Sequence, residues 1–229
     1  MPRVAPTVVI LAAGQGTRMC SDLPKVLHPL CGRPMVVWPV AAALEAGAGR
    51  VVVIHAPGTP LGEFLPEGVE YAPQEQPLGT GDAVRAAAGA IERDATVIVL
   101  SGDVPLVTAD CVRELAEARE RERAAATVLT VELEDPSGYG RVVRAADGAV
   151  QRIVETKVPG DATAHELAIR EINTGIYAFD GGALLDALET LEPANAQGEY
   201  YLPDVLPAMR DAGLVISAHQ TDEIGRAHV

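Results

Sequence analysis

Two cations and two glycines lie close together within the first 25 residues, in a pattern suited to binding phosphate. An apolar run ends at Leu11-Ala12-Ala13 and continues into Gly14, Gly16, Arg18 and Lys25. Glycine lets the backbone approach a ligand closely, and successive N–H groups in such a turn form a concave site for an anion. The two cationic side chains supply the positive charge that phosphate groups require. The segment therefore predicts a phosphate-binding loop.

The spacing separates this loop from two other phosphate-binding patterns. The dinucleotide-binding pattern requires a third glycine three residues after the second, and here that position holds Met19. The Gly-Lys-Ser/Thr of a P-loop is also absent. Only two of the 18 basic residues are lysines, Lys25 and Lys157. This use of lysine indicates a need for a compact ammonium at both positions, although a genome that favours arginine would produce the same bias.

A carboxylate and a polar loop follow two further apolar runs. Asp103 lies directly after the run 96–100, and open α/β sheets bind ligands at the carboxyl ends of such strands. A hard carboxylate at that place suits Mg²⁺ held jointly with substrate phosphates, and the alternative role is that of a turn-forming aspartate. The loop from Gln74 to Asp82 follows the run 69–72, and by itself it is typical of a helix start capped by Thr80.

Composition and charge exclude several classes of protein. The chain has 229 residues, a net charge of −14 and a pI near 4.7, whereas a nucleic-acid surface needs clustered positive charge. Cys20, Cys31 and Cys111 form no metal-binding pair and suit a reducing compartment. The amino terminus lacks a signal-peptide layout, and the longest apolar run, 8–13, is too short to span a bilayer. We therefore expect a cytoplasmic protein with neither a nucleic-acid nor a membrane partner.

Strand-like and helix-like segments alternate along the chain, which predicts an α/β fold with a mostly parallel sheet flanked by helices. After about residue 133 turn formers become denser and the strands shorter. We interpret residues 1–229 as one domain, with a nucleotide-binding half, 1–132, and an acceptor-binding half, 133–229, that contains a small β subregion. The expected strands are 8–12, 51–55, 69–72, 96–100, 127–131, 141–144, 150–155, 172–179 and 215–219. The expected helices are 34–46, 80–90, 108–123, 182–191 and 200–212.

The loop also resembles a known family signature. The segment Leu11-Ala-Ala-Gly-x-Gly-Thr-Arg-Met-x-Ser-x-x-Pro-Lys-Val-Leu-His28 is similar to that of the bacterial N-acetylglucosamine-1-phosphate uridyltransferases, and similar segments continue to at least residue 204. The resemblance implies a Rossmann-like nucleotidyltransferase domain. It also implies the reaction of UTP with N-acetylglucosamine 1-phosphate, which gives UDP-N-acetylglucosamine and pyrophosphate for cell-wall precursors. These family members are usually bifunctional, with the pyrophosphorylase in the amino-terminal half.

On the nucleotide side, the resemblance assigns roles to residues of two loops. Leu11, Ala12, Ala13 and Gly14 would line the triphosphate site. Gln74 and backbone N–H groups near Gly79 and Thr80 would read the base edge, where a wrong base leaves buried polar groups unpaired. Asp82 stands where many relatives carry histidine, and Pro77 stands where some carry glutamine; we expect both changes to tune the pocket without abolishing it.

On the acceptor side, the resemblance implies that Gly140 offers a backbone N–H and that Glu155 and Asn173 hydrogen-bond the sugar. Glu199 and Tyr201 would shape the N-acetyl end. Each of these residues alone is more typical of an ordinary loop or surface position. Their joint presence in the order of the family supports the assignment.

The implied reaction needs positioning and charge stabilisation, because the attacking phosphate oxygen is already ionised. The resemblance assigns Arg18 and Lys25 to the triphosphate as catalytic residues and Asp103 to Mg²⁺ as a ligand. No general base is required, so His28 is expected to be structural.

The resemblance to the uridyltransferase family ends near the last residues of the sequence. Relatives supply a second metal ligand from an Asn in a Gly-Val-Asn-x-Arg segment, which these 229 residues lack, as they lack the hexapeptide repeats of an acetyltransferase half. Residues 225–229 are compatible with a cloning scar and with a truncation point, and the sequence alone decides neither between these two nor the oligomeric state. Two alternatives remain: a pyrophosphorylase for another sugar phosphate or nucleotide, and a nucleotide-binding remnant with weak catalysis. A Rossmann-type dehydrogenase is disfavoured by Met19.

Overall fold

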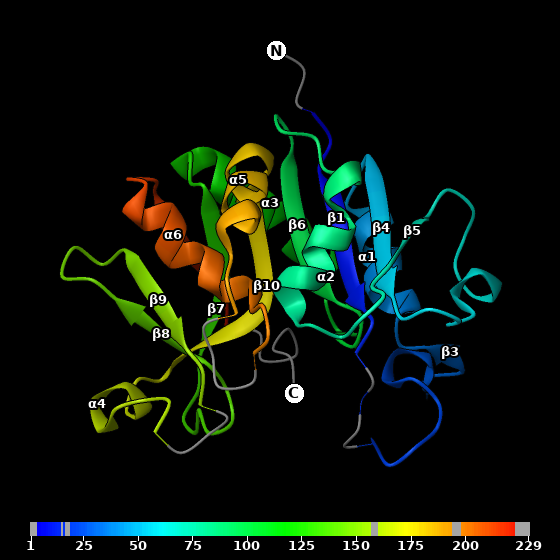
Figure 1. Ribbon diagram of the computed structural model, residues 1–229, viewed down its shortest axis with the longest axis horizontal. Helices are drawn as coiled ribbons and strands as arrows, with labels where there is room; N and C mark the ends of the chain where they lie inside the picture. The colour runs from blue at the N-terminus through cyan, green and yellow to red at the C-terminus, as the bar shows by residue number, and fades with distance from the viewer. Residues whose placement is uncertain (1–3, 15, 17–18, 157–159, 194–197, 223–229) are drawn as a thin grey trace.

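A mixed central sheet organises the chain, as the computed structural model shows for residues 4–14, 16, 19–156, 160–193 and 198–222 (Figure 1). Its strands run in the order β11-β7-β10-β6-β1-β4-β5. All neighbouring pairs along this order are parallel except those made by β10, which is antiparallel to both β6 and β7. The strands are β1 (Thr7–Ala12), β4 (Arg50–His55), β5 (Glu70–Pro73), β6 (Thr96–Ser101), β7 (Ala126–Glu132), β10 (Glu171–Asp180) and β11 (Ile216–Gln220).

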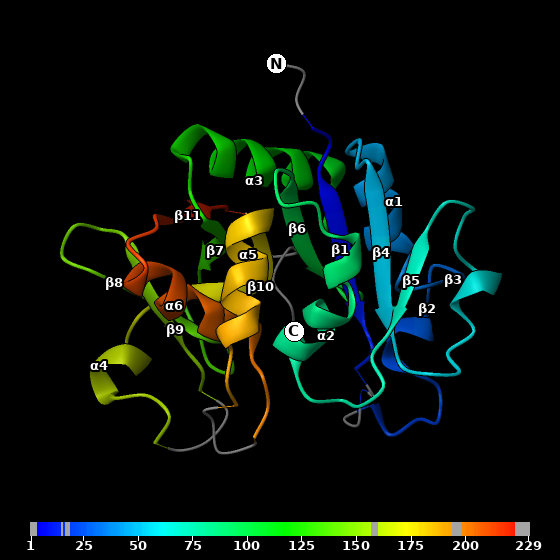
Figure 2. The ribbon, with the colours of Figure 1, turned by 45° about the horizontal axis from the view of Figure 1, so that its top comes forward.

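Helices cover both faces of this sheet, as Figures 1 and 2 show. Alternate residues of β1 point to opposite faces, so that Val9 lies in one core while Val8 and Ile10 lie in the other. The first core is closed by α2 (Thr80–Ala86), α5 (Gly181–Thr190) and α6 (Val205–Asp211). The second is closed by α1 (Val37–Glu45) and α3 (Ala109–Glu122). This is the predicted Rossmann-like arrangement of a mostly parallel sheet flanked by helices.

A small β subregion extends from the sheet, as expected. The hairpin β8 (Arg141–Arg144) and β9 (Val150–Val154) joins the first part of β10 through the pair Ile172–Arg141. The short helix α4 (Ala164–Leu167) follows, and a capping box between Thr163 and Glu166 fixes its start. These elements lie beside the amino end of β10, which is the end nearest the candidate site.

Two expected helix starts are wrong. Pro34 pairs with Pro29 in a two-residue hairpin, β2 (Pro29–Leu30) with β3 (Arg33–Pro34), so α1 begins only at Val37. The expected helix 200–212 begins as a 3₁₀ turn at Leu202–Asp204 and becomes α-helical at Val205. Tyr200 does not join the helix, because its backbone is hydrogen-bonded to the loop before α2 and to the first turn of α2. The predicted cap of α3 is confirmed, since the Thr108 hydroxyl accepts from Cys111 N.

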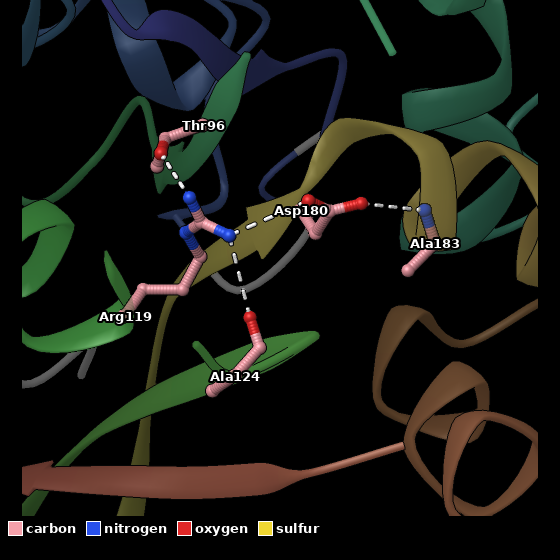
Figure 3. A network of polar contacts seen from close by, with 5 residues as sticks. All are labelled: Thr96, Arg119, Ala124, Asp180 and Ala183. Carbon is pink, nitrogen blue, oxygen red and sulfur yellow. Dashed lines mark hydrogen bonds and ion pairs between the residues drawn. The ribbon is translucent and has the colours of Figure 1, made fainter. Parts of the chain in front are cut away.

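Arg119 connects several elements by hydrogen bonds at the end of the sheet opposite the candidate site (Figure 3). Its Nη2 donates to Thr96 Oγ1 over 2.9 Å, and its Nη1 donates to Ala124 O and Asp180 Oδ2 over 3.4 Å each. The other carboxylate oxygen of Asp180 accepts from Ala183 N and caps α5. One guanidinium thus joins α3, β6, the end of β10 and the connection between α3 and β7. None of the helices in the described ranges is long and apolar enough to cross a bilayer.

Candidate active site

The carboxyl ends of β1 and β6 carry the residues that the sequence assigns to phosphate and metal. Leu11 and Ala12 close β1, and the Leu11 carbonyl accepts a 2.8 Å hydrogen bond from Gly102 N. A Cβ on Gly102 would lie 3.0 Å from that oxygen, so glycine allows the two strand ends to approach. Beyond them, Ala13 and Gly14 enter the loop, and, chain neighbours apart, no described residue has a heavy atom within 4 Å of where a Cβ on Gly14 would stand.

A cavity of about 250 Å³ lies beside this loop, a little below the range of about 300–1,000 Å³ that is usual for small-molecule sites. Three of the predicted triphosphate residues border it. Its lining consists of Ala12, Ala13, Gly14, Asp22, Pro24, Ala56 and Thr59. Arg18, the predicted catalytic cation, lies outside the described residues.

Lys25 and Asp103 are brought together by these two strand ends. Lys25 Nζ lies 2.7 Å from Asp103 Oδ2, and their side chains are 27% and 9% exposed. Asp103 Oδ1 accepts a 2.6 Å hydrogen bond from the Ser101 hydroxyl. Gly16 has φ +61°, and a Cβ there would lie 2.6 Å from Lys25 Cβ, so the loop passes directly over the lysine. The predicted catalytic lysine and the predicted metal ligand therefore form one ion pair.

The donor set around Asp103 fits a metal that is shared with substrate. Among the described residues no group of three or more His, Cys, Asp or Glu could hold a metal by itself. Mg²⁺ is commonly bound through one or two carboxylates together with substrate phosphates, and members of nucleotidyltransferase families generally use a divalent metal. Asp103 supplies such a carboxylate at the phosphate-binding edge.

Gln74 lies at the end of β5, in the loop that was assigned to the base. It is 7% exposed, and its backbone N–H donates to His55 O. Its side-chain Nε2 donates to Gly79 O over 3.0 Å and to Asp82 Oδ2 over 2.9 Å. Gly79 precedes α2 with φ +111°, a conformation that glycine adopts readily. The predicted cap role of Thr80 is wrong, since the N-cap position is Gly79 and the helix start has no side-chain cap.

The loop from Gln74 to Asp82, called the base loop below, is hydrogen-bonded to the segment that precedes α6. That segment lies more than 100 residues later in the chain. Tyr200 N donates to Leu78 O and Gly81 N donates to Tyr200 O, both over 2.7 Å. Thr80 Oγ1 accepts from Leu202 N over 2.9 Å. In Figures 1 and 2 this orange segment runs beside the start of α2. The nucleotide-side residues Gly79 and Thr80 therefore adjoin the acceptor-side residues Glu199 and Tyr201.

The structure also gathers the predicted acceptor residues. Asn173 N donates to Gly140 O over 2.9 Å, and a Cβ on Gly140 would lie 3.4 Å from Glu155 Oε1. The Asn173 side chain is fixed from two sides: Nδ2 donates to Tyr177 Oη over 2.6 Å, and Oδ1 accepts from Gly175 N over 3.1 Å. Because β10 is antiparallel to β6, its amino end lies at the same edge as the carboxyl ends of β1 and β6 (Figure 1).

Acidic groups surround this acceptor cluster. Burial, together with the nearby carboxylates of Glu199 and Glu155, raises the pKa of Tyr201 to about 12. Burial and Glu155 also raise the pKa of Asp204 above its ordinary value. Tyr201 consequently stays a neutral phenol at physiological pH. Glu155 and Glu199 therefore lie close enough to Tyr201 to act on it electrostatically.

Sequence reasoning missed four residues at these sites. Asp82 was noted only as a departure from the family, yet it holds the Gln74 amide. Ser101 donates to Asp103, Tyr177 accepts from Asn173, and the pKa of Asp204 is raised in part by Glu155. Ser101 and Tyr177 lie two and four residues from predicted site residues, so a search for polar neighbours along the strands could have found them. His28 bonds the Leu23 carbonyl through Nε2, in line with a structural role.

The sequence of this chain matches a family model and the sequences of known proteins. Residues 8–199 match the model of the MobA-like NTP transferase domain. "Bifunctional protein GlmU" of Shouchella clausii is 49% identical over 219 residues, which are 94% of this chain and 47% of the relative. The protein of the same name from Geobacter metallireducens is 48% identical over 92% of this chain and 44% of its own length. The chain thus spans about half the length of these curated relatives.

A solved structure supports the fold. UDP-glucose pyrophosphorylase complexed with UDP-glucose superimposes with a TM-score of 0.76, covering 96% of this chain and 91% of that one at 17% sequence identity. The family match covers the phosphate loop, the Lys25–Asp103 pair, the base loop and most of the acceptor cluster. By sequence and by fold, this chain belongs to the MobA-like NTP transferase domain family.

Proposed function

We propose that the chain is a uridylyltransferase that converts UTP and N-acetylglucosamine 1-phosphate into UDP-N-acetylglucosamine and pyrophosphate for cell-wall precursor synthesis. The observation that supports it most is the meeting of three residue sets at one edge of the sheet: Lys25 with Asp103, Gln74 with its loop, and the acceptor cluster. The hydrogen bonds made by Tyr200 join the last two sets. A reaction between a nucleoside triphosphate and a sugar phosphate needs such adjacent sites.

In the proposed division of labour, residues 1–132 bind the nucleotide and residues 133–229 bind the sugar phosphate, within one domain. Gln74 and the loop at Gly79 hold the base, and the turn from Leu11 to Gly14 holds the triphosphate. Gly140, Glu155, Asn173, Glu199 and Tyr201 hold the sugar.

The chemistry of this step requires stabilisation of negative charge and no general base. An ionised phosphate oxygen of the sugar phosphate attacks the α-phosphorus of UTP and forms a new P–O bond. The bond from the α-phosphorus to the bridging oxygen breaks, and pyrophosphate leaves with the electron pair. Lys25 lies where it can offset the leaving charge, and we assign Arg18 the same role by its place in the loop.

We further propose that the divalent metal is Mg²⁺ and that Asp103 is one of its protein ligands. When bound, the ion would neutralise phosphate charge at the reaction centre. Ser101 donates to Oδ1 of Asp103 and so fixes the orientation of the carboxylate toward the phosphate-binding edge.

A pyrophosphate-release assay tests the proposal directly. UTP, CTP, ATP and GTP are each supplied with N-acetylglucosamine 1-phosphate, glucose 1-phosphate or glucosamine 1-phosphate, with and without Mg²⁺. We expect the fastest release with UTP and N-acetylglucosamine 1-phosphate, and loss of release when EDTA removes the metal. Faster release with another nucleotide or sugar phosphate would contradict the assigned substrates. Nucleotide binding without any turnover would contradict catalysis.

A further inference from the structure

The side-chain amide of Gln74 is held in one orientation by two acceptors. Gly79 O lies 3.0 Å from Nε2, and Asp82 Oδ2 lies 2.9 Å from the same atom. A backbone carbonyl and a carboxylate can only accept hydrogen bonds at neutral pH, so the amide nitrogen must face them. Rotating the amide by 180° would set its oxygen against two acceptors. Gln74 itself is 7% exposed, so water cannot readily replace either partner.

This orientation determines what Gln74 offers to a ligand. Both N–H bonds of the amide are used within the protein, which leaves only the carbonyl oxygen, Oε1. No described residue donates to Oε1, and Oε1 is not among the buried polar atoms that lack a partner, so solvent reaches it. Nearby, none of the described residues accepts from the backbone N–H of Gly79. The loop from Gln74 to Asp82 therefore presents an acceptor from the Gln74 side chain together with a donor from the backbone of Gly79.

We propose that Asp82 is a positioning residue that sets base specificity by holding Gln74 as a pure hydrogen-bond acceptor. This inference rests on the proposed function, in which Gln74 meets the base of the nucleotide. The edge of uracil carries an N–H donor between two carbonyl acceptors, which complements an acceptor beside a donor. Cytosine carries a ring nitrogen that accepts and an exocyclic amine that donates, so it would pair acceptor with acceptor and donor with donor. A buried mismatch of this kind discriminates strongly, because the polar groups of the site lose their partners.

Gly79 O alone would hold the amide less firmly. It can accept one of the two N–H bonds, and the second bond requires the carboxylate of Asp82. A hydrogen bond to a charged acceptor is stronger than one to a neutral acceptor. Without Asp82, the amide gains freedom to rotate and to donate to the ring nitrogen of cytosine. Asp82 thus acts on the base through Gln74 and touches no reacting atom.

The test compares base preference in three variants. Asp82→Leu removes the acceptor, and Asp82→Asn keeps a neutral amide oxygen that can still accept from Gln74. Asp94→Leu is the matched control, since Asp94 is an exposed acid away from this pocket. For each protein, kcat and KM are measured with UTP and with CTP, and the affinities for both nucleotides are measured by calorimetry. UTP and CTP carry the same triphosphate, so the ratio of their kcat/KM values removes any general effect of charge on phosphate binding.

We expect Asp82→Leu to lower the UTP-to-CTP ratio by at least about tenfold, mainly through KM. Asp82→Asn should restore part of the ratio, and Asp94→Leu should leave it unchanged. A purely structural role for Asp82 would lower melting temperature and activity with both nucleotides while preserving the ratio; an unchanged ratio in Asp82→Leu overturns the inference. If Asp82→Leu fails to fold, Asp82→Ala decides in its place, because it also removes the acceptor, and a UTP-to-CTP ratio equal to that of the wild type in this variant overturns the inference. Failure of the proposed function is distinguishable, since it appears in the wild type as an absence of turnover.

Discussion

Replacing Lys25 with methionine tests both the charge stabilisation and the geometry that supports it. Methionine keeps most of the side-chain length and removes the ammonium that lies 2.7 Å from Asp103 Oδ2. At that separation two unit charges attract by about 6 kcal/mol at an effective dielectric of about 20. Desolvation of the carboxylate and the loss of side-chain freedom offset much of this attraction, so the net contribution is smaller.

The exposure of the two side chains narrows the range expected for the loss in free energy of unfolding. Fully exposed pairs contribute about 0.2–1 kcal/mol, whereas breaking a buried pair costs about 3–5 kcal/mol. Lys25 is 27% exposed and Asp103 is 9% exposed, and the Ser101 hydroxyl still bonds Asp103 in the variant. We therefore expect a loss of about 1–3 kcal/mol, which in a chain of this size lowers the melting temperature by about 2–10 °C. Turnover should fall by about 10²–10³, because a preorganised cation at the phosphates is removed.

The assay pairs urea unfolding with pyrophosphate release, and Arg93→Met serves as the control. Arg93 forms a 2.8 Å pair with Asp186 in which the side chains are 61% and 64% exposed, so solvent screens the pair and its loss should change neither stability nor turnover measurably. Near-normal turnover in Lys25→Met would refute the assigned role in catalysis. A stability loss no larger than that of Arg93→Met would refute the reasoning from burial.

Three further changes probe other parts of the site. Gly79→Ala should weaken UTP binding by at least about tenfold in calorimetry, because its Cβ would lie 2.5 Å from a backbone oxygen at φ +111°; wild-type affinity would contradict this. Tyr177→Phe frees the Asn173 amide and should raise KM for the sugar phosphate about three- to tenfold while sparing KM for UTP; equal changes in both would argue against an acceptor-side role. The pKa of Asp204 is raised by burial and by Glu155, so its charged form destabilises the fold above that pKa. Asp204→Asn should then raise the melting temperature at pH 7–8, with the gain shrinking as the pH falls and Asp204 becomes protonated; a gain independent of pH would contradict the cause.

Most strands could be predicted from the sequence because a strand buried on both faces leaves a nearly continuous apolar run. The observed bounds of β1, β6 and β8 differ from the expected ranges by at most one residue at either end. The errors at Pro34 and Tyr200 have a different origin. Proline suits a first helical turn and also a strand edge, and only the partner Pro29 decides between them. The backbone bonds of Tyr200 depend on a loop more than 100 residues away, which no local pattern records.

The site residues were predictable by type, and their pairings were not. Lys25 and Asp103 were assigned separately, to phosphate and to metal, because their ion pair depends on how closely β1 and β6 approach. Thr80 was expected to cap α2, but its hydroxyl accepts from Leu202, whose position depends on the packing of α6. Asp82 looked like a simple departure from the family because its partner, Gln74, lies on the preceding loop.

The place of β10 in the sheet bears on how the protein is made. This strand, residues 171–180, inserts between β6 and β7, which precede it by about 40 residues or more. While the chain emerges from the ribosome, β6 and β7 must therefore wait without their shared neighbour, each with an edge unpaired. The base pocket waits longer still, until Tyr200 and Leu202 have been synthesised. Nucleotide can thus protect the nascent chain only after residue 202 has been synthesised, and we expect aggregation chiefly in the interval before β10 emerges.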